Sequence, residues 1–292
     1  MNALRTPREV PGSAPGRGPA TVRLDPTPVR PRGARRGRLS RRLQGVVLSL
    51  FGPIVLLGAW EALSRTATID PRFWPAPSSL VATARDLVVE DGLLHDVRLS
   101  LVRVLGGFAL GAIPGVALGL AMGLSWPVRA LIMPLASTIY ALPKIALLPL
   151  VIIALGLGEA SKLAIVAISI FFLVVLNTMG GVLAIDRSYR DVARNLGASR
   201  LEVFVTVALP GALPAIFTGL RLALGFALTV IVGTEFLSSR DGGIGDLIWQ
   251  SYQTLAIQKM FVGLFATAIL GWALTAALDL VERLVIPWRQ VD

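Results

Sequence analysis

Residues 188–214 read SYRDVARNLGASRLEVFVTVALPGALP, and this polar segment lies between two long apolar runs. It holds two capping boxes, in which a serine stands three residues before an acidic residue: Ser188 before Asp191, and Ser199 before Glu202. In each pair the side chains satisfy N–H groups that the start of a helix leaves without partners. The segment therefore predicts two consecutive short helices.

Gly197 falls between the two predicted helices, at a place where a left-handed residue ends a helix. We expect a bend there, with the second helix leading to Pro210 and the next apolar run. A bent helix pair of this kind suits docking into a groove of a partner protein. It equally suits an interfacial connector that only joins two membrane spans, and the residues alone favour neither interpretation.

The rest of the chain is strongly apolar, with 54% hydrophobic and 16% charged residues and a mean hydropathy of +0.70. A soluble domain has about 25% charged residues. A helix of roughly 20 apolar residues crosses the hydrocarbon core of a bilayer, where every backbone polar group needs an internal partner. We therefore predict an all-α integral membrane protein with about six transmembrane helices. They fall near residues 45–63, 99–124, 139–158, 161–183, 212–237 and 260–283.

The formal charge of +10 is concentrated in residues 1–42, which hold eleven arginines against two acidic residues. This segment is also rich in Pro and Gly, so it cannot bury enough apolar surface to fold. We predict a disordered tail over 1–42 and a transmembrane domain over 43–292. No aromatic residue lies among the arginines, so no nucleic-acid partner is expected. The positive-inside rule places the tail, and with six crossings both termini and loop 184–211, in the cytoplasm.

A stripe of glycines marks the second apolar run, where a glycine recurs every four residues. This spacing puts them on one helix face, which lets another helix backbone approach closely. The approaching helix belongs either to the same chain or to a second subunit. Pro114 interrupts the run, and we expect a kink there. The five glycines are Gly107, Gly111, Gly115, Gly119 and Gly123.

Two segments are expected outside the membrane. Residues 78–94 have the pattern of an amphipathic interfacial helix, capped by Ser78 or Ser79. Residues 238–258 are expected to form a loop, in which the run Gly-Gly-Ile-Gly at 242–245 makes a tight turn.

The stretch 128–158 is too long for one simple span, since at 1.5 Å per residue it would extend about 46 Å. Three prolines, Pro134, Pro143 and Pro149, divide it. We expect a short helix at the cytoplasmic face, followed by a span that starts near Leu142.

The chain has few of the residues that catalytic and metal sites commonly use. It has no cysteine and a single histidine, His95, so zinc sites and Ser-His-Asp triads lack most of their usual parts. No G-x-x-x-x-G-K-[ST] phosphate loop occurs. We predict no catalytic, cofactor or metal site, and His95 is expected on the surface. If ATP drives transport, another chain binds the nucleotide.

Polar residues at membrane depth are candidates for function. Lys144 is expected either to snorkel to the cytoplasmic interface or to contact an anion in a translocation path. Glu235, near the outer end of the fifth span, either lines an outer gate or pairs locally. Asn177 either bridges helices by a hydrogen bond or touches the solute. Further charged residues are expected in local pairs or interfacial clusters: Glu159 with Lys162, and Asp279 with Glu282 and Arg283.

The loop resembles the Glu-Ala-Ala motif of binding-protein-dependent ABC importer permeases. That pattern is Glu-Ala-Ala, three residues, Gly, nine residues, then Ile-x-Leu-Pro. Here the chain has Asp191-Val192-Ala193, three residues, Gly197, nine residues, then Val-Ala-Leu-Pro at 207–210. Residues 142–162, 171–186 and 233–245 are similar to the branch that serves nitrate, sulfonate, taurine and bicarbonate importers.

The resemblance implies a type I ABC importer permease fold and a bacterial cytoplasmic (inner) membrane protein with several spans. It implies three protein partners: an ABC ATPase subunit that uses ATP and Mg, an extracytoplasmic solute-binding protein, and a second permease subunit, expected to be an identical copy. Loop 186–210 would couple the permease to the ATPase. The coupling residues carried over from the motif are Asp191, Val192, Ala193, Gly197, Leu209 and Pro210.

The function implied is translocation of a small anionic or zwitterionic solute, such as an aliphatic sulfonate, taurine or nitrate, by a non-catalytic membrane subunit. The alternative is a stand-alone carrier or channel. That class favours inverted repeats or polar broken helices at the bilayer midplane, and the sequence has no such repeat.

Overall fold

The computed structural model describes residues 34–237 and 242–288, with the backbone alone for residues 34–47, 49 and 50. The chain divides into two units, residues 1–55 and 56–292. In the first unit the described residues belong to a helix that starts at Ala34, inside the segment expected to be a disordered tail; residues 1–33 of that tail lie outside the described part.

The described residues are helical throughout, with turns and short extended links and no strand. This agrees with the all-α class. The helices are α1 (Ala34–Arg65), α2 (Pro77–Val89), α3 (Leu93–Leu124), α4 (Trp126–Ala141), η1 (Lys144–Leu147), α5 (Leu148–Leu155), α6 (Glu159–Leu183), α7 (Arg187–Asn195), α8 (Arg200–Val203), η2 (Phe204–Ala208), α9 (Leu209–Glu235), α10 (Ile244–Gln253) and α11 (Ile257–Val285).

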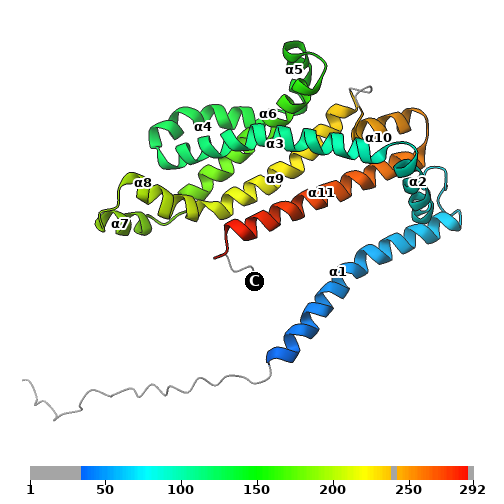
Figure 1. Cartoon of the computed structure of the whole chain (residues 1–292), viewed down its shortest axis with the longest axis horizontal. Coiled ribbons are helices and arrows are strands. Elements are labelled where there is room, and N and C mark those ends of the chain that lie inside the picture. The colour runs from blue at the N-terminus through cyan, green and yellow to red at the C-terminus, as the bar shows by residue number, and fades with distance from the viewer. Residues whose placement is uncertain (1–33, 238–241, 289–292) are drawn as a thin grey trace, which may run out of the picture. The chain divides into compact units, whose positions relative to one another are not determined.

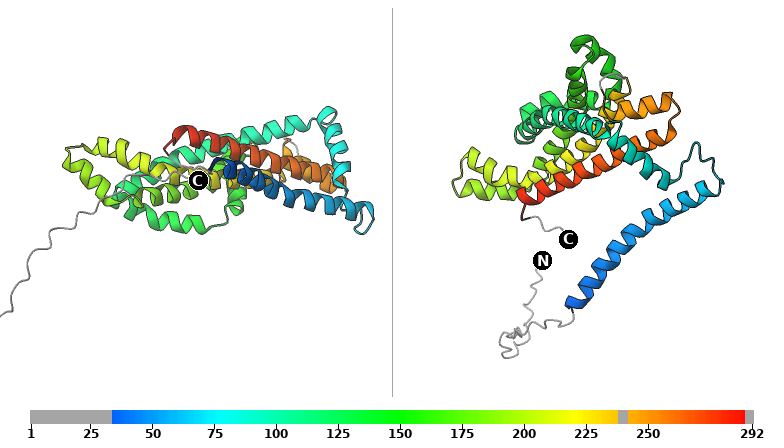
Figure 2. Two further views of the ribbon diagram at one scale, coloured as in Figure 1. Left: turned by 90° about the horizontal axis from the view of Figure 1, so that it is seen from below. Right: turned by 45° about the vertical axis from the view of Figure 1, so that its right-hand side comes forward.

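Within the second unit, α3, α6, α9 and α11 form a bundle of long helices (Figure 1). The short helices α7 and α8 lie at one end of this bundle, and α2 and α10 lie at the other, beside α11 (Figure 2). Four helices of the described residues are long and apolar enough to cross a membrane, and one bent pair makes a possible fifth span. The membrane class is thus confirmed, and the predicted count of six is approximate.

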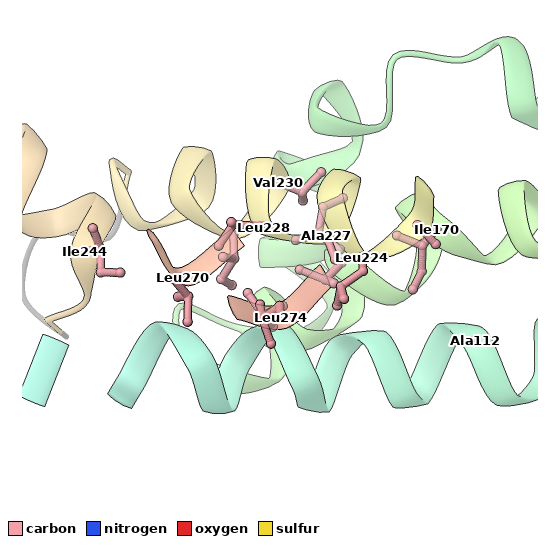
Figure 3. Packing of buried hydrophobic residues seen from close by; sticks show 14 of the residues in the cluster. Ala112, Ile170, Leu224, Ala227, Leu228, Val230, Ile244, Leu270 and Leu274 are labelled. Carbon is pink, nitrogen blue, oxygen red and sulfur yellow. The ribbon is translucent and has the colours of Figure 1, made fainter. Parts of the chain in front are cut away.

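The core of the bundle contains apolar side chains from α3, α6, α9, α10 and α11, as Figure 3 shows for a part of the cluster. Burial of such side chains against neighbouring helices, rather than against lipid, fixes which face of each span points inward.

The glycine stripe packs against α6 of the same chain. A Cβ added at Gly107 would lie 2.6 Å from Cβ of Val166, and one added at Gly119 would lie 2.6 Å from Cβ of Thr178. Of the two partners expected for the stripe, the structure therefore selects a helix of the same chain. Pro114 lies inside α3, which continues through it as one helix from Leu93 to Leu124.

The break expected near Leu142 is confirmed, but the helix after it ends at Leu155 and is shorter than the predicted span. Helix α4 ends at Ala141, and η1 with α5 then continues at an angle of 92° to it. The cause is local. Leu142 has φ −68° and ψ 140°, because the ring of Pro143 excludes the helical region for the residue before it. The eight residues of α5 extend about 12 Å, which is too short to cross the hydrocarbon core.

The expected caps of α2 were also wrong. Its N-cap is Ala76, with Pro77 at the start of the helix, and no side chain of α2 caps it. Instead Glu61 of α1 accepts hydrogen bonds from the backbone N–H of Ser78 at 3.0 Å and from its hydroxyl at 2.7 Å. A carboxylate at the positive end of the helix dipole replaces the predicted serine cap.

Residues 238–258 were predicted as an outer loop, but they contain the ten-residue helix α10. The tight turn before this helix is confirmed in its described part. Gly242 and Gly243 have φ of 67° and 115°, in the left-handed region that favours glycine. Residues 238–241 lie outside the described part.

Candidate functional site

The candidate coupling hairpin, residues 186–203, begins at Asp186 rather than at Ser188. The carboxylate of Asp186 is the N-cap of α7 and accepts a hydrogen bond of 2.9 Å from the backbone N–H of Ser188. The first predicted capping box was therefore wrong: the cap lies two residues earlier, and Ser188 is inside the helix. Hydrogen bonds from the backbone and the side chain of Ser188 lower the pKa of Asp186, which keeps the cap ionised.

The bend at Gly197 is confirmed. Gly197 has φ +85°, and its N–H donates to the carbonyl of Arg194 at 2.9 Å. The next N–H, of Ala198, donates to the carbonyl of Ala193 at 3.0 Å. These two bonds make a Schellman motif, which ends α7 and turns the chain. A Cβ at Gly197 would meet nothing within 4 Å, so the conformation and not crowding requires glycine.

The second capping box is confirmed in full. The hydroxyl of Ser199 accepts from the backbone N–H of Glu202 at 3.3 Å, and the carboxylate of Glu202 accepts from the backbone N–H of Ser199 at 2.6 Å. The backbone N–H groups of Ser199 and Glu202, at the start of α8, thereby both have acceptors. The hairpin consists of two short helices with defined ends on each side of Gly197.

Arg190 fastens the hairpin to the bundle. Its Nη2 donates a 2.8 Å hydrogen bond to the carbonyl of Val182, in the last turn of α6. A cation at a helix C-terminus satisfies a free carbonyl and interacts favourably with the dipole. The hairpin is thus held by a side chain as well as by the chain itself.

The hairpin exposes large apolar side chains. Leu196 is 83% exposed and Leu201 is 70% exposed. Tyr189 and Val192 are also exposed, as is the carboxylate-bearing Asp191. Apolar side chains gathered on a protruding element are typical of a surface that binds a protein.

The motif residues do not all lie together. Asp191, Val192, Ala193 and Gly197 belong to the hairpin, whereas Leu209 and Pro210 begin α9. Leu209 packs against the buried cluster of Val182, Ala212 and Ile216. The last two motif residues therefore anchor the hairpin in the bundle.

Two of the three candidate path residues, Lys144 and Asn177, each donate a hydrogen bond to the backbone carbonyl four residues earlier in the chain. Lys144 donates a hydrogen bond to the carbonyl of Tyr140 and lies 4.6 Å above the ring of that residue. Asn177 donates to the carbonyl of Leu173 at 2.8 Å, and it lies where α9 packs closely at Gly219.

Glu235, the third candidate, is fully buried and lies in a charge cluster that joins α3, α6, α9 and α10. Its carboxylate accepts from Arg103 Nη1 at 2.8 Å, from Ser100 Oγ at 2.8 Å and from the backbone N–H of Gly245 at 2.9 Å. On the opposite edge of its guanidinium, Arg103 binds Glu159. The expected local pairing of Glu159 with Lys162 is present, with 3.7 Å between the charged atoms.

Arg103 and Ser100 were not predicted from the sequence. The available signal was an arginine four residues after the start of the predicted span 99–124, because a charge within a span almost always pairs with a second charge or marks a pathway.

A second cluster joins α9 to α11. Arg221 binds Asp279 at 2.6 Å and Glu282 at 2.5 Å. The acidic pair was expected in an interfacial cluster, whereas its partner Arg221 was not identified from the sequence.

The arrangement was compared with known proteins. Residues 115–291 match the family described as binding-protein-dependent transport system inner membrane component. The chain is 31% identical to the taurine transport system permease protein TauC of Escherichia coli (strain K12), over 84% of this chain and 90% of that protein. It is 30% identical to the putative aliphatic sulfonates transport permease protein SsuC of Bacillus subtilis (strain 168), over 87% and 92%. It is also 30% identical to the nitrate import permease protein NrtB of Leptolyngbya laminosa, over 88% and 93%.

Among solved structures, the inward-facing MetNI methionine ABC transporter contains a chain of the same fold. The TM-score is 0.54 at 19% identity, over 66% of this chain and 95% of that one. The likeness confirms the type I importer permease fold. The long apolar helices, the hairpin with its motif spacing and the family match agree: this chain belongs to the inner membrane components of binding-protein-dependent transport systems, the multi-pass permease subunits of ABC importers.

Proposed function

We propose that this permease translocates a small anionic or zwitterionic solute, namely an aliphatic sulfonate, taurine or nitrate, in a complex driven by ATP. The relatives named for taurine, sulfonate and nitrate transport support this choice of solute. The complex contains a cytoplasmic ATPase, which binds ATP and Mg²⁺, an extracytoplasmic solute-binding protein and a second copy of this chain. Both termini lie in the cytoplasm, on the side of the hairpin.

The observation that carries the proposal is the coupling hairpin. It is fixed at both helix ends by caps, fastened to α6 by Arg190, and exposes apolar side chains around Gly197. Such an element transmits a push from the ATPase because neither short helix has a frayed start through which force is lost. Asp191, Val192 and Ala193 contact the ATPase, and Gly197 sets the angle.

The test replaces Gly197 in the full complex, reconstituted with its ATPase and receptor in liposomes. Gly197→Glu places a side chain at φ +85°, whereas Gly197→Asn keeps a residue that tolerates this conformation. We expect Gly197→Glu and Asp191→Lys to insert and retain their fold but to lose solute uptake and solute-stimulated ATP hydrolysis. Gly197→Asn should keep most of both.

Normal uptake by Gly197→Glu and Asp191→Lys would refute the assignment of the hairpin. Uptake by this chain without any ATPase would instead support a stand-alone carrier or channel.

For the path, we propose that Lys144 contacts the solute and that Asn177 and Glu235 hold the helices that form the path or its gate. Lys144 is half-buried and its ammonium group contacts only groups of Tyr140 among the contacts described here. Lys144→Met should raise the solute concentration for half-maximal uptake without changing the ATPase rate in the absence of solute. An unchanged concentration would remove Lys144 from the path.

A further inference from the structure

A pocket of about 400 Å³ lies at the end of the bundle opposite the coupling hairpin, where α2, α3, α10 and α11 meet (Figure 2). A water molecule takes about 30 Å³ of the liquid, so the pocket has room for a small organic solute. The charged residues among its described lining are three carboxylates and one cation: Asp91, Asp96, Asp246 and Lys259. The lining of this acidic pocket thus carries two more negative charges than positive ones.

One of the three carboxylates is neutralised within the lining. Asp91 Oδ2 lies 2.5 Å from the ammonium nitrogen of Lys259, and both side chains are 46% exposed. This ion pair therefore lies at the solvent-facing part of the acidic pocket. The negative charges that it leaves are those of Asp96 and Asp246.

Asp246 is buried and only partly hydrogen-bonded. Its side chain is 4% exposed, and its Oδ2 accepts a 2.8 Å hydrogen bond from the side-chain amide of Gln250. Its Oδ1 is also buried and has no hydrogen-bond donor among the described residues. The first turn of α10 favours a negative charge here, but it gives Oδ1 no donor. Because a buried carboxylate oxygen without a donor is costly, this oxygen indicates a place where a donor from outside the chain would be favoured.

Asp96 adds a second carboxylate beside Asp246. Its Oδ1 accepts a 2.9 Å hydrogen bond from the backbone N–H of Gly243. The charge of Asp246 repels Asp96, and the charges of His95 and Arg103 attract it. His95 is exposed, and Arg103 is already bound by two carboxylates of the charge cluster. A cation bound to both Asp96 and Asp246 would relieve the repulsion between them.

The chemistry of the lining favours an ammonium group over a metal ion. Within the described part of the chain, no group of three or more His, Cys, Asp and Glu residues could hold a metal ion. A primary ammonium has a single charge and three N–H donors, and its hydrogen bonds to carboxylates are among the strong ones. It therefore supplies both the charge and the donor that the two carboxylates lack. Of the solutes proposed above, taurine carries an ammonium group and nitrate does not.

We propose that the acidic pocket binds the primary ammonium group of a zwitterionic solute, with Asp246 and Asp96 as its acceptors. The inference rests on the proposed import function and narrows the solute to one that carries an amine, such as taurine. The ammonium group donates to Oδ1 of Asp246 and to the carboxylate of Asp96. With the hairpin on the cytoplasmic side, the acidic pocket lies toward the side from which the receptor delivers the solute, and it is an entry subsite.

The test measures solute binding by the permease–ATPase complex in lipid nanodiscs, without receptor and at constant ionic strength. The probes are taurine and isethionate, which has a hydroxyl group in place of the ammonium group. The readout is the solute concentration that gives half of the maximal thermal stabilisation. This concentration should be at least about tenfold lower for taurine, because isethionate lacks the charge-assisted hydrogen bonds.

Variants of the two acceptors assign the difference to the acidic pocket. Asp246→Asn should raise the taurine concentration at least about tenfold and leave the isethionate concentration unchanged. Asp86→Asn, which removes an exposed carboxylate of α2 that does not line the pocket, is the matched control and should change neither. Asp96→Asn keeps a carbonyl acceptor for Gly243 and should act as Asp246→Asn does, so it serves if that variant does not fold.

Three results would overturn the inference. The first is an equal concentration of taurine and isethionate in the wild type. The second is an unchanged taurine concentration in the folded asparagine variants. The third is stabilisation of the wild type by sodium chloride at the same concentrations as taurine, because the acidic pocket would then bind any small cation.

The proposed function fails separately. If the wild-type complex with its receptor takes up no sulfonate, taurine or nitrate in liposomes, the proposed function is refuted whatever the nanodisc titration gives. If that complex takes up one of these solutes and the asparagine variants bind taurine as the wild type does, the ammonium subsite alone is refuted.

Discussion

Gly111→Ala should destabilise the bundle, although alanine is the better helix former. The added Cβ would lie 2.6 Å from the carbonyl oxygen of Ala167 and 2.7 Å from Cγ1 of Ile170. Non-bonded carbon contacts are normally about 3.5–4.0 Å, so α3 and α6 would have to separate by roughly 1 Å. The carbonyl oxygen belongs to the backbone and cannot rotate away. Overpacking of this kind costs about 1–3 kcal/mol.

Two glycines supply matched controls, since an added Cβ at Gly180 in α6 or at Gly225 in α9 would meet nothing within 4 Å. There the change to alanine should be neutral or stabilising by up to about 1 kcal/mol. Thermal unfolding in detergent, followed by the fluorescence of the six tryptophans, compares the three variants. At about 2–4 °C per kcal/mol, Gly111→Ala should lower the Tm by several degrees. A Tm for Gly111→Ala equal to or above both controls would refute close packing of α3 on α6 at this point.

Three more changes test the hairpin and the charge cluster. Ser199→Ala removes half of the capping box and should destabilise α8 by about 1 kcal/mol. We expect faster amide exchange in α8 and weaker solute-stimulated ATP hydrolysis. Ser199→Asp, which keeps a capping side chain, should restore both. Glu235→Leu removes the buried carboxylate that accepts from Arg103 and should cost about 3–5 kcal/mol in thermal unfolding. Glu235→Gln retains an acceptor and should cost less; equal losses would contradict the hydrogen-bonded geometry. The pKa of Asp186 is lower in the folded chain than its ordinary value of 3.8, so its contribution to α7 is present above that pH and is lost as the pH falls through the lowered value. The protection of the α7 amides, measured relative to their intrinsic exchange rates, should therefore fall at acid pH in the wild type and stay unchanged there in Asp186→Asn.

Local sequence signals predicted the features that depend on a few neighbouring residues. The left-handed bend at Gly197 and the capping box of Ser199 and Glu202 each need about one turn of helix to be recognised, and the glycine period needs only a single helix. The N-cap at Asp186 was missed because Ser188, two residues later, gives an equally good local signal. Choosing between them requires the position of the end of α6, which the local pattern does not contain.

Features that depend on distant residues were not predicted. Arg103 and Glu235 are 132 positions apart, and nothing in either neighbourhood specifies the other. The same reason explains why Arg221 was not joined to Asp279. Pro143 did signal the break after α4, but the apolar run beyond it was long enough by composition to be taken for a span. The direction of a chain after a proline is set by packing, which composition does not reveal.

One continuous helical run connects the hairpin to the charge cluster. Helix α8, the π-helical turn η2 and α9 follow one another without a loop from Arg200 to Glu235, a length of about 54 Å. Its first residue belongs to the hairpin that the proposed ATPase contacts, and its last residue binds Arg103. A push on the hairpin along this axis therefore reaches the cluster through helix alone. The one irregular place in this run is η2, where the hydrogen bonds have the wider π-helical spacing, next to Pro210, which lacks an N–H. If the hairpin contacts the ATPase as proposed, this helix is the physical route by which movement of the hairpin reaches the buried pair of Arg103 and Glu235.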